Sequence, residues 1–389
     1  MQSGKDSTIK YEDMKAKYGG FLYPAFKIVI GDKDLSAVKS GVVVYDLEAE
    51  LSAGFEASVV SFRVTEILDA KDSKYSADIM KKYLVLGASA VISVGYASKL
   101  EQIFMGFISK VRFIHDEDCP MQAEVMAMDV KGIMMSNAYS RQLTAKTYSD
   151  AVKEIFAGNR YQKIQSAGIF NSQLSISDTP DKNKNQSSEQ ESADTIEMVD
   201  ESDYEFVVKA AKKFNFEFFI SNGNVIFRKN DSEKKVRITL GAGKGIRTFD
   251  ITYDITGLVE QVEARGMNDG EGKLISATEK LNNKLWSGNT VKAVLEGSKK
   301  VYFDPTIRDK EEAELRAASI MHNMSNRFGY LECVCDGIPE ILPGCLIKLE
   351  GLGAQADNIF YITEVSHLIS DTRGYRTKII GKAASLNGE

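Results

Sequence analysis

The residues best suited to bind a metal are four cysteines, two of which lie close together along the chain. Cys333 and Cys335 are two positions apart, so on a strand both thiols point to the same face. A zinc site needs two more ligands. Cys345 could supply one, but the sequence has no further CxxC motif and no histidine pair. We therefore interpret these cysteines as small core residues and predict neither a metal site nor a cofactor.

Two further segments resemble ligand-binding loops. Residues 240–246, LGAGKGI, are similar to a phosphate-binding loop, but the Ser or Thr required after Gly-Lys is missing and a strand follows instead of a helix. Residues 115–118, HDED, contain three carboxylates without the spacing of a calcium-binding loop. We interpret both segments as turns.

The three histidines, His115, His322 and His367, are the natural candidates for acid–base catalysis. None of them lies in a motif with a serine, cysteine or aspartate partner. Nucleophile elbows, zincin helices and dinucleotide-binding fingerprints are also absent from the sequence. We therefore predict that the protein is not an enzyme and has no catalytic residues.

The overall charge argues against nucleic-acid binding. The sequence has 49 basic and 55 acidic residues, a net charge of −6, whereas nucleic-acid binders present a basic surface. No apolar run is long enough to span a membrane, and residues 1–20 are too polar for a signal peptide. We predict no nucleic-acid contact and no membrane insertion.

Most of the elements that position these residues have the alternating pattern of strands. Helices are also indicated after Thr147, after Ser202 with its capping partner Glu205, and over residues 309–328. Because strands and helices rarely alternate as βαβ units, the chain is predicted to be α+β and mainly β.

Three local patterns divide the strand-rich regions. Asn222-Gly223 between two apolar runs predicts a hairpin turn. Residues 131–136, KGIMMS, are interpreted as a further strand. Residues 171–202 are low in complexity and poor in apolar side chains, which predicts a flexible linker.

Two segments, residues 86–114 and 342–369, resemble each other and predict an internal repeat. Both contain a strand that ends near a glycine, an Ile-Phe pair, and then an isoleucine three residues before a valine. The matching positions are Gly87, Gly95, Ile103, Phe104, Ile108 and Val111 in the first copy, and Gly344, Gly351, Ile359, Phe360, Ile362 and Val365 in the second. The repeat predicts two related antiparallel β-barrels, since closing a sheet removes its exposed edges.

We therefore expect two barrel domains with an α+β domain inserted between them. The predicted segments are a polar N-terminal arm over 1–20, a first barrel over 21–146, a middle domain over 147–240 that contains the linker, and a second barrel over 241–389 with an insertion at about 268–308 before the helix at 309–328.

Three groups of motifs, taken in order along the chain, resemble one known family. They are Gly95-Tyr96, Ile103-Phe104, Gly106, Ile108 and Val111 with Met128-Asp129; Ser202–Phe206 followed by FEFFISNGNVIFR; and LPGCLIKLEGL, FYITEVSHLI with Tyr361, Thr363, Val365 and His367, and GYRTKII. Together they resemble the phage late control D family. These are baseplate hub proteins of contractile tails, similar to the N-terminal hub part of type VI secretion spike proteins. The resemblance spans most of residues 21–385.

The resemblance implies a homotrimer in which each chain supplies two tail-tube-like barrels, which gives pseudo-sixfold symmetry. Such a hub would join the hexameric tail tube to a trimeric spike, and a separate spike protein is expected because no spike segment follows in this sequence. Tape-measure and baseplate wedge proteins are further partners that the resemblance suggests. The expected location is the baseplate of a phage tail, tailocin or related injection system, assembled in the host cytoplasm.

Two other functions stay open at this point. A tail-associated peptidoglycan hydrolase could use a carboxylate pair that no motif marks. A carbohydrate-binding protein of the tail tip would need exposed aromatic side chains, and the sequence has only one tryptophan, Trp286.

Overall fold

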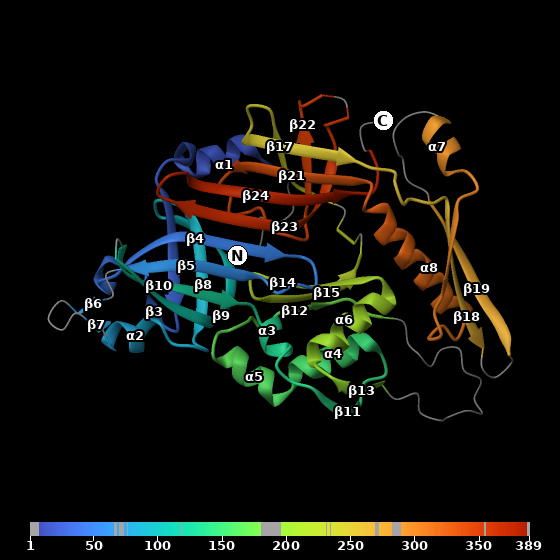
Figure 1. The fold of residues 1–389 in the computed structure, drawn as a ribbon, viewed down its shortest axis with the longest axis horizontal. Coiled ribbons are helices and arrows are strands. Elements are labelled where there is room, and N and C mark those ends of the chain that lie inside the picture. The colour runs from blue at the N-terminus through green and yellow to red at the C-terminus, as the bar shows by residue number, and fades with distance from the viewer. Residues whose placement is uncertain are drawn as a thin grey trace.

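A computed structural model describes most of the chain. The described residues are 8–65, 68–69, 74–75, 77–117, 119–179, 196–230, 232–233, 235–268, 272–281, 289–353 and 355–386. Strands predominate, as predicted. A large sheet fills the upper left of Figure 1, a middle segment in green lies below it, and a smaller sheet lies to the right beside a long helix.

Fourteen strands form the large sheet, and they fall into two halves. The first half comprises β2 (Pro24–Ile30), β3 (Lys33–Asp34), β4 (Val43–Ser52), β5 (Val59–Thr65), β8 (Ser89–Tyr96), β9 (Lys99–Asp116) and β10 (Cys119–Met128). The second half comprises β16 (Val236–Gly241), β17 (Ile246–Tyr253), β21 (Gly329–Asp336), β22 (Leu346–Glu350), β23 (Ile359–Ser370) and β24 (Gly374–Ala383), with β1 (Ile9–Lys10) beside β16.

The two halves have the same strand order. Across the sheet, the first half reads β4-β5-β10-β9-β8-β2 and the second reads β17-β21-β24-β23-β22-β16. Strands in matching places also follow one another in the same order along the chain. One pairing differs, because β2 runs antiparallel to β8 whereas β16 runs parallel to β22. The duplicated strand order therefore covers six strands in each half.

The halves meet where β23 pairs antiparallel with β4. This pairing makes β17-β21-β24-β23-β4-β5-β10-β9 one continuous run of eight strands (Figure 1). Within the described residues no run of strands closes on itself, so the predicted pair of closed barrels is not confirmed. The physical reason is that β4 pairs with β23 of the other half. Closure of the first half would require β4 to pair instead with β2, which lies at the opposite end of that half.

Each half has its own apolar core, built from the side chains that alternate along its strands. The first core includes Ile28, Val60, Phe62, Ile92, Phe104, Ile108 and Val125. The second includes Ile238, Leu331, Cys333, Cys335, Phe360, Ile362 and Ile379. Cys333 and Cys335 thus lie in the core, as predicted.

The middle segment lies between β10 and β16 along the chain. Its elements are β11 (Tyr139–Leu143), α4 (Tyr148–Ala157), α5 (Asn159–Ser166), β12 (Leu174–Ile176), β13 (Ile196–Glu201), α6 (Asp203–Phe214), β14 (Phe216–Ser221) and β15 (Asn224–Lys229). β11 pairs with β13, and β14 and β15 form a hairpin with β12 at its side. Both ends of the predicted linker 171–202 therefore contain paired strands, and residues 180–195 lie outside the described residues.

Local signals predicted the elements of this segment well. Thr147 caps α4 by accepting a hydrogen bond from the backbone N–H of Asp150, and Ser202 and Glu205 form the predicted capping box of α6. Asn222 and Gly223 join β14 to β15 with φ values of +50° and +79°. Two consecutive positive φ angles are those of a type I′ turn, which suits the twist of a hairpin.

The expected polar arm at residues 1–20 contains structured residues. β1 runs parallel to β16, and α1 (Tyr11–Lys17) follows it. The side chains of Tyr11 and Tyr18 are buried, at 8% and 2% exposure. From residue 9 onward this segment is part of the packed structure.

The insertion in the second half forms a small sheet with two helices. Its elements are β18 (Gln261–Asn268), β19 (Lys273–Lys280), α7 (Asn289–Leu295), β20 (Lys299–Phe303) and α8 (Lys310–Ser325). α8 packs on β18 and β19, with the small residues Ala313 and Ala317 buried against them (Figure 1). The predicted helix 309–328 corresponds to α8, which Asp309 caps through the backbone N–H of Glu312.

Short elements complete the described chain. They are the strands β6 (Leu68–Asp69) and β7 (Lys74–Tyr75), the α-helices α2 (Ala77–Tyr83) and α3 (Lys131–Met134), and the 3-10 helices η1 (Gly19–Phe21) and η2 (Val38–Ser40). The strand interpretation of residues 131–136 was wrong, because α3 occupies this run. The buried Lys131 donates hydrogen bonds from its Nζ to the carbonyl oxygens of Gly54 and Glu56. None of the described helices is long and apolar enough to cross a membrane.

Candidate functional site

The two predicted repeat segments use the same backbone contacts. The N–H of Gly87 donates to the carbonyl oxygen of Ile108 at 2.9 Å, and the N–H of Gly344 donates to that of Ile362 at 2.9 Å. Both glycines have a left-handed backbone, with φ of +80° and +84°. Ile108 and Ile362 are each 1% exposed. Gly87 and Gly344, and Ile108 and Ile362, therefore occupy equivalent places.

The residue after each isoleucine forms the same irregularity. The register of β9 against β10 shifts between Ile108 and Lys110, and that of β23 against β24 shifts between Ile362 and Glu364. The hydroxyl of Ser109 donates to the carbonyl oxygen of Met126, and that of Thr363 donates to the carbonyl oxygen of Ile380, both at 3.2 Å. A β-bulge bends a strand and increases its twist. β9 and β23 therefore have matching irregularities at equivalent positions.

The Ile-Phe pairs do not occupy identical positions. Counting from the matched isoleucines, Phe360 aligns with Gly106, while Phe104 lies two residues earlier. The Cζ atom of Phe104 lies 2.7 Å from where a side chain on Gly106 would begin, so its ring fills the space that Gly106 leaves. Two residues are one full side-chain period of a strand, and both rings therefore reach the core. Ile103 is buried, whereas Ile359 is partly exposed.

The remaining predicted repeat positions are less alike. β8 and β22 align through Ser89 and Leu346, which places Gly351 one position away from the equivalent of Gly95. Val365 is buried opposite Leu51 of β4, while its counterpart Val111 is only partly buried. The functional role of all these positions stays a prediction.

The joint between the halves contains a buried histidine. His367 of β23 lies opposite Ala49 of β4 and is fully buried. Its Nε2 donates to the carbonyl oxygen of Ile341 at 3.1 Å, so its Nδ1 is the acceptor for the hydroxyl of Tyr375 at 2.8 Å. Burial lowers the pKa of His367 to about 4. The side chain is thus a neutral structural element of the joint.

The face of the eight-stranded run opposite the core is polar and crosses both halves. A hollow of about 880 Å³ on this face is lined by charged residues of mixed sign, which include Asp46, Glu48, Arg63, Glu124, Arg247, Arg376 and Lys378. Burial and the neighbouring Glu50 raise the pKa of Glu48, and Lys378 opposes this shift. This composition suits a solvated surface better than a site for one small charged ligand.

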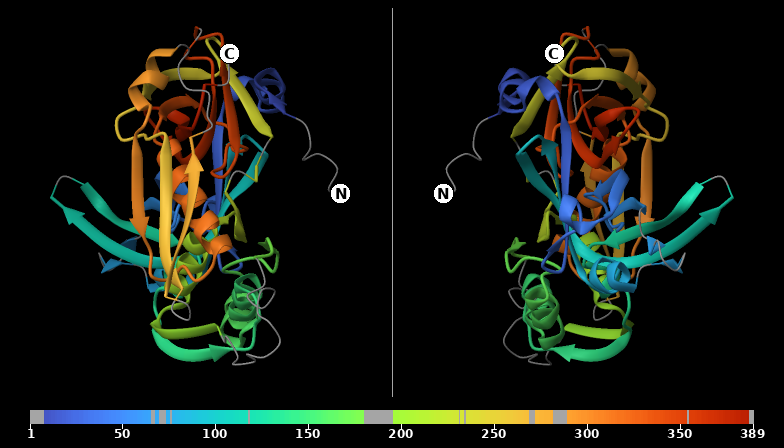
Figure 2. Two further views of the ribbon diagram at one scale, coloured as in Figure 1. Left: turned by 90° about the vertical axis from the view of Figure 1, so that its right-hand side faces the viewer. Right: turned by 90° about the vertical axis from the view of Figure 1, so that its left-hand side faces the viewer.

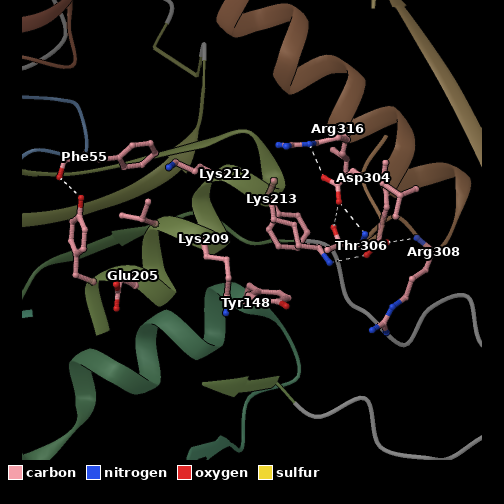
Figure 3. A pocket seen from close by; sticks show the side chains of 16 residues that line it. Phe55, Tyr148, Glu205, Lys209, Lys212, Lys213, Asp304, Thr306, Arg308 and Arg316 are labelled. Atoms are coloured by element: carbon pink, nitrogen blue, oxygen red, sulfur yellow. Dashed lines mark hydrogen bonds and ion pairs between the residues drawn. The ribbon is translucent and has the colours of Figure 1, made fainter. Parts of the chain in front are cut away.

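A second hollow, of about 710 Å³, lies between α6 and α8 and is shown in Figure 3. Two of its cationic side chains are paired with acids that also line the hollow. Lys213 lies 2.8 Å from Glu312, and Arg316 lies 3.0 Å from Asp304. The first pair links the middle segment to the insertion, the second lies within the insertion, and both indicate a structural contact.

The candidate ligand sites of the sequence remain without chemical support. The thiols of Cys333 and Cys335 are buried, and burial raises the pKa of Cys333 to about 12. LGAGKGI forms a tight turn between β16 and β17, closed by backbone hydrogen bonds between Gly241 and Lys244. Across the described ranges, no three His, Cys, Asp or Glu side chains could hold a metal together. Trp286 and Asp118 lie outside the described residues.

A comparison with protein families identifies a match over most of the chain. The family described as the Alg8 N-terminal domain matches residues 49–371. The chain belongs to this family. The matched region of this Alg8 N-terminal domain family runs from within β4 to just after β23, and so includes parts of both halves and the whole middle segment. No curated protein sequence matches the chain.

Solved structures with this fold include several tail proteins. The 43 kDa tail protein of prophage MuSo2 from Shewanella oneidensis is 12% identical with a TM-score of 0.67, and the match covers 93% of this chain and 98% of that chain. A tail protein from Neisseria meningitidis MC58 is 13% identical with a TM-score of 0.64, covering 93% and 97%. An E. coli type VI secretion component, described as similar to the T4 bacteriophage tail proteins gp27 and gp5, is 14% identical with a TM-score of 0.55, covering 91% and 76%. The chain has the fold of these proteins, and the predicted resemblance is confirmed at that level.

The sequence indicated the strands that flank the repeat segments, but their correspondence between the two halves was missed. The correspondence of β4 with β17, and of β5 with β21, appears only in the strand pairings. A signal was present, because residues 47–52, LEAELS, and residues 249–254, FDITYD, share the order apolar, acidic, apolar, polar, apolar, polar.

Proposed function

We propose that this protein is a non-enzymatic structural hub of a contractile phage tail, tailocin or related injection system. It acts as a homotrimer and is located in the tail baseplate. The observation that carries the proposal is the duplicated strand order within a chain that has the fold of tail proteins. Two similar halves in each of three chains supply six similar wedges around one axis.

The role is mechanical. The three chains form a ring. One side of this ring presents the six similar halves to the hexameric tail tube, and the other side presents three-fold features to a separate trimeric spike. The hub starts the tube, connects it to the spike and moves with both on contraction. Tape-measure and baseplate wedge proteins are further partners. The proposal includes two tail-tube-like barrels per chain. Each barrel would be completed by strands of a neighbouring half in the assembly, rather than by closure of one half on itself.

Native mass spectrometry tests the proposal on the purified chain and on the chain co-expressed with its tube and spike partners. Three copies of the 43.0 kDa chain give an expected mass of about 129 kDa. A mass of one chain under both conditions contradicts the trimer. Incubation with purified cell walls tests the non-enzymatic role, since release of soluble fragments would overturn it.

A further inference from the structure

Beyond its bulge, one edge of β23 pairs with a strand of the other half, whereas the described residues provide no strand for the matching edge of β9. Beyond its bulge, β23 pairs through Glu364–Ile369 with Leu47–Ser52 of β4. On β9 the equivalent residues are 110–115, because Ile108 matches Ile362 and the bulges coincide. In the described structure β9 pairs with β8 only as far as Phe107 and Ile108, and with β10 on its other edge. The β9–β10 hairpin, in teal in Figure 2, extends away from the body of the protein.

β17 is the counterpart of β4, the strand that covers β23. Ala49 of β4 aligns through Val60 with Ala127, and Ile251 of β17 aligns through Leu331 with Gly381. Ala127 and Gly381 in turn lie opposite Ile108 and Ile362. The pairings thus match β17 to β4 residue by residue, without reference to sequence similarity.

β17 is also an edge strand with an exposed side. In the described structure it pairs with β21 alone, and it ends the sheet at the top of Figure 1. Residues 247–250 are all exposed, and Phe249 is 45% exposed. An exposed edge strand with an exposed aromatic residue favours pairing with another strand.

We propose that β17 of one copy pairs antiparallel with residues 110–115 of β9 in the next copy, in the register that joins β4 to β23. This inference rests on the proposed function and names the subunit contact of that trimer. The register places Arg112 opposite Thr252, as Ser366 lies opposite Glu50 within the chain. Arg112 then has Asp250 and Asp254 as diagonal neighbours, so the basic segment of β9 meets the acidic segment of β17.

The proposed partner is a second copy of this chain. β17 and β9 lie at opposite ends of the eight-stranded run and do not pair with each other in the described structure. Each copy offers one β17 edge and one β9 edge, which makes the contact head-to-tail. Head-to-tail contacts form a ring when the rotation between copies closes. The β4–β23 pairing already joins the two halves inside each chain in this register. With the proposed β17–β9 pairing between chains, every two neighbouring halves of the ring would be joined in the same way.

Disulfide cross-linking tests the register. The variant Arg112→Cys/Thr252→Cys, in a background with Cys119→Ser, is oxidised and analysed on a non-reducing gel. Both positions are exposed in the single chain. Paired strands bring Cα atoms within disulfide range, so we expect at least about tenfold more covalent trimer than from the mismatched variant Arg112→Cys/Thr248→Cys.

Two controls separate the possible failures. Glu50→Cys/Ser366→Cys is the equivalent pair inside one chain and should form an intrachain disulfide. Native mass spectrometry reports whether each variant is trimeric. A trimer in which the matched pair cross-links no better than the mismatched pair, while the intrachain control forms, overturns the proposed contact and leaves the proposed function standing. A chain that remains monomeric with its partners contradicts both.

Discussion

His367 is a residue whose chemistry is tied to the joint between the two halves. It is buried on β23, opposite β4, with both ring nitrogens engaged by Ile341 and Tyr375. A protonated ring here would place a charge in the apolar interior and remove the acceptor for the Tyr375 hydroxyl. The folded protein therefore holds this imidazole neutral.

This depressed pKa predicts a specific loss of stability in mild acid. The folded value is about 4, whereas an unfolded histidine titrates near pH 6.5, so only the unfolded chain takes up the proton in between. The contribution is present above pH 6.5 and is lost as the pH falls toward 4. Between pH 7 and pH 5 we expect a decrease of about 2 kcal/mol in the free energy of unfolding from this residue.

Urea unfolding of the parent and of His367→Gln at both pH values isolates this contribution. Carboxylates also titrate near pH 5, but both proteins share them. The pH-dependent loss should be smaller in His367→Gln than in the parent, because the variant lacks the buried imidazole. Equal pH dependence in the two proteins would contradict a buried neutral His367.

At the scale of elements, the β14–β15 hairpin of the middle segment contacts both halves of the large sheet. At its turn, Gly223 lies close to the side chain of Met105 on β9. At its base, Arg228 donates from a terminal nitrogen to the carbonyl oxygen of Gly344 at 2.7 Å and pairs with Glu217, which also accepts from the Tyr361 hydroxyl. Burial raises the pKa of Glu217, and Arg228 and Tyr361 oppose that shift.

The packing of the β14–β15 hairpin distinguishes two glycines that occupy equivalent places in the repeat. Gly87 and Gly344 have nearly the same positive φ, but a side chain on Gly87 would meet open space while one on Gly344 would overlap the Phe219 ring. Gly87→Ala should cost about 1 kcal/mol from backbone strain alone. Gly344→Ala should cost roughly 2 kcal/mol more, because it adds a steric clash in a packed contact. Thermal and urea unfolding of both variants measure the difference, and equal losses would contradict the packing of the hairpin.

Short-range elements of this fold could be predicted because their signals are local. The capping residues Thr147 and Ser202 and the Asn222-Gly223 turn satisfy or orient backbone groups within a few residues. The strand interpretation of residues 131–136 was wrong because its apolar residues serve a short helix equally well, and period alone does not separate the two over six residues.

Long-range pairings could not be predicted in the same way. Any two alternating strands are compatible in sequence, so nothing in residues 43–52 identifies β23 as the partner of β4. The repeat indicated a duplicated unit through residues near Ile108 and Ile362. The repeat could not indicate that β23 of the second half pairs with β4 of the first half instead of each half closing into its own barrel.

At the scale of the whole molecule, the two halves are alike in their sheets and different in what is attached to them. The small sheet and α8 are inserted between β17 and β21, where the first half has only residues 53–58 between β4 and β5. The middle segment lies once in each chain, between β10 of the first half and β16 of the second. In the proposed trimer the sheets would therefore repeat six times, while the insertions would repeat three times. Such an arrangement could join a six-fold partner to a three-fold one.

Electron cryomicroscopy of the purified assembly, viewed down its axis, tests this claim most directly. The account predicts a closed ring of three chains in which six similar sheet wedges surround a channel, with three-fold features outside them. A ring with only three wedges, or chains whose two halves do not take equivalent places around the axis, would contradict it.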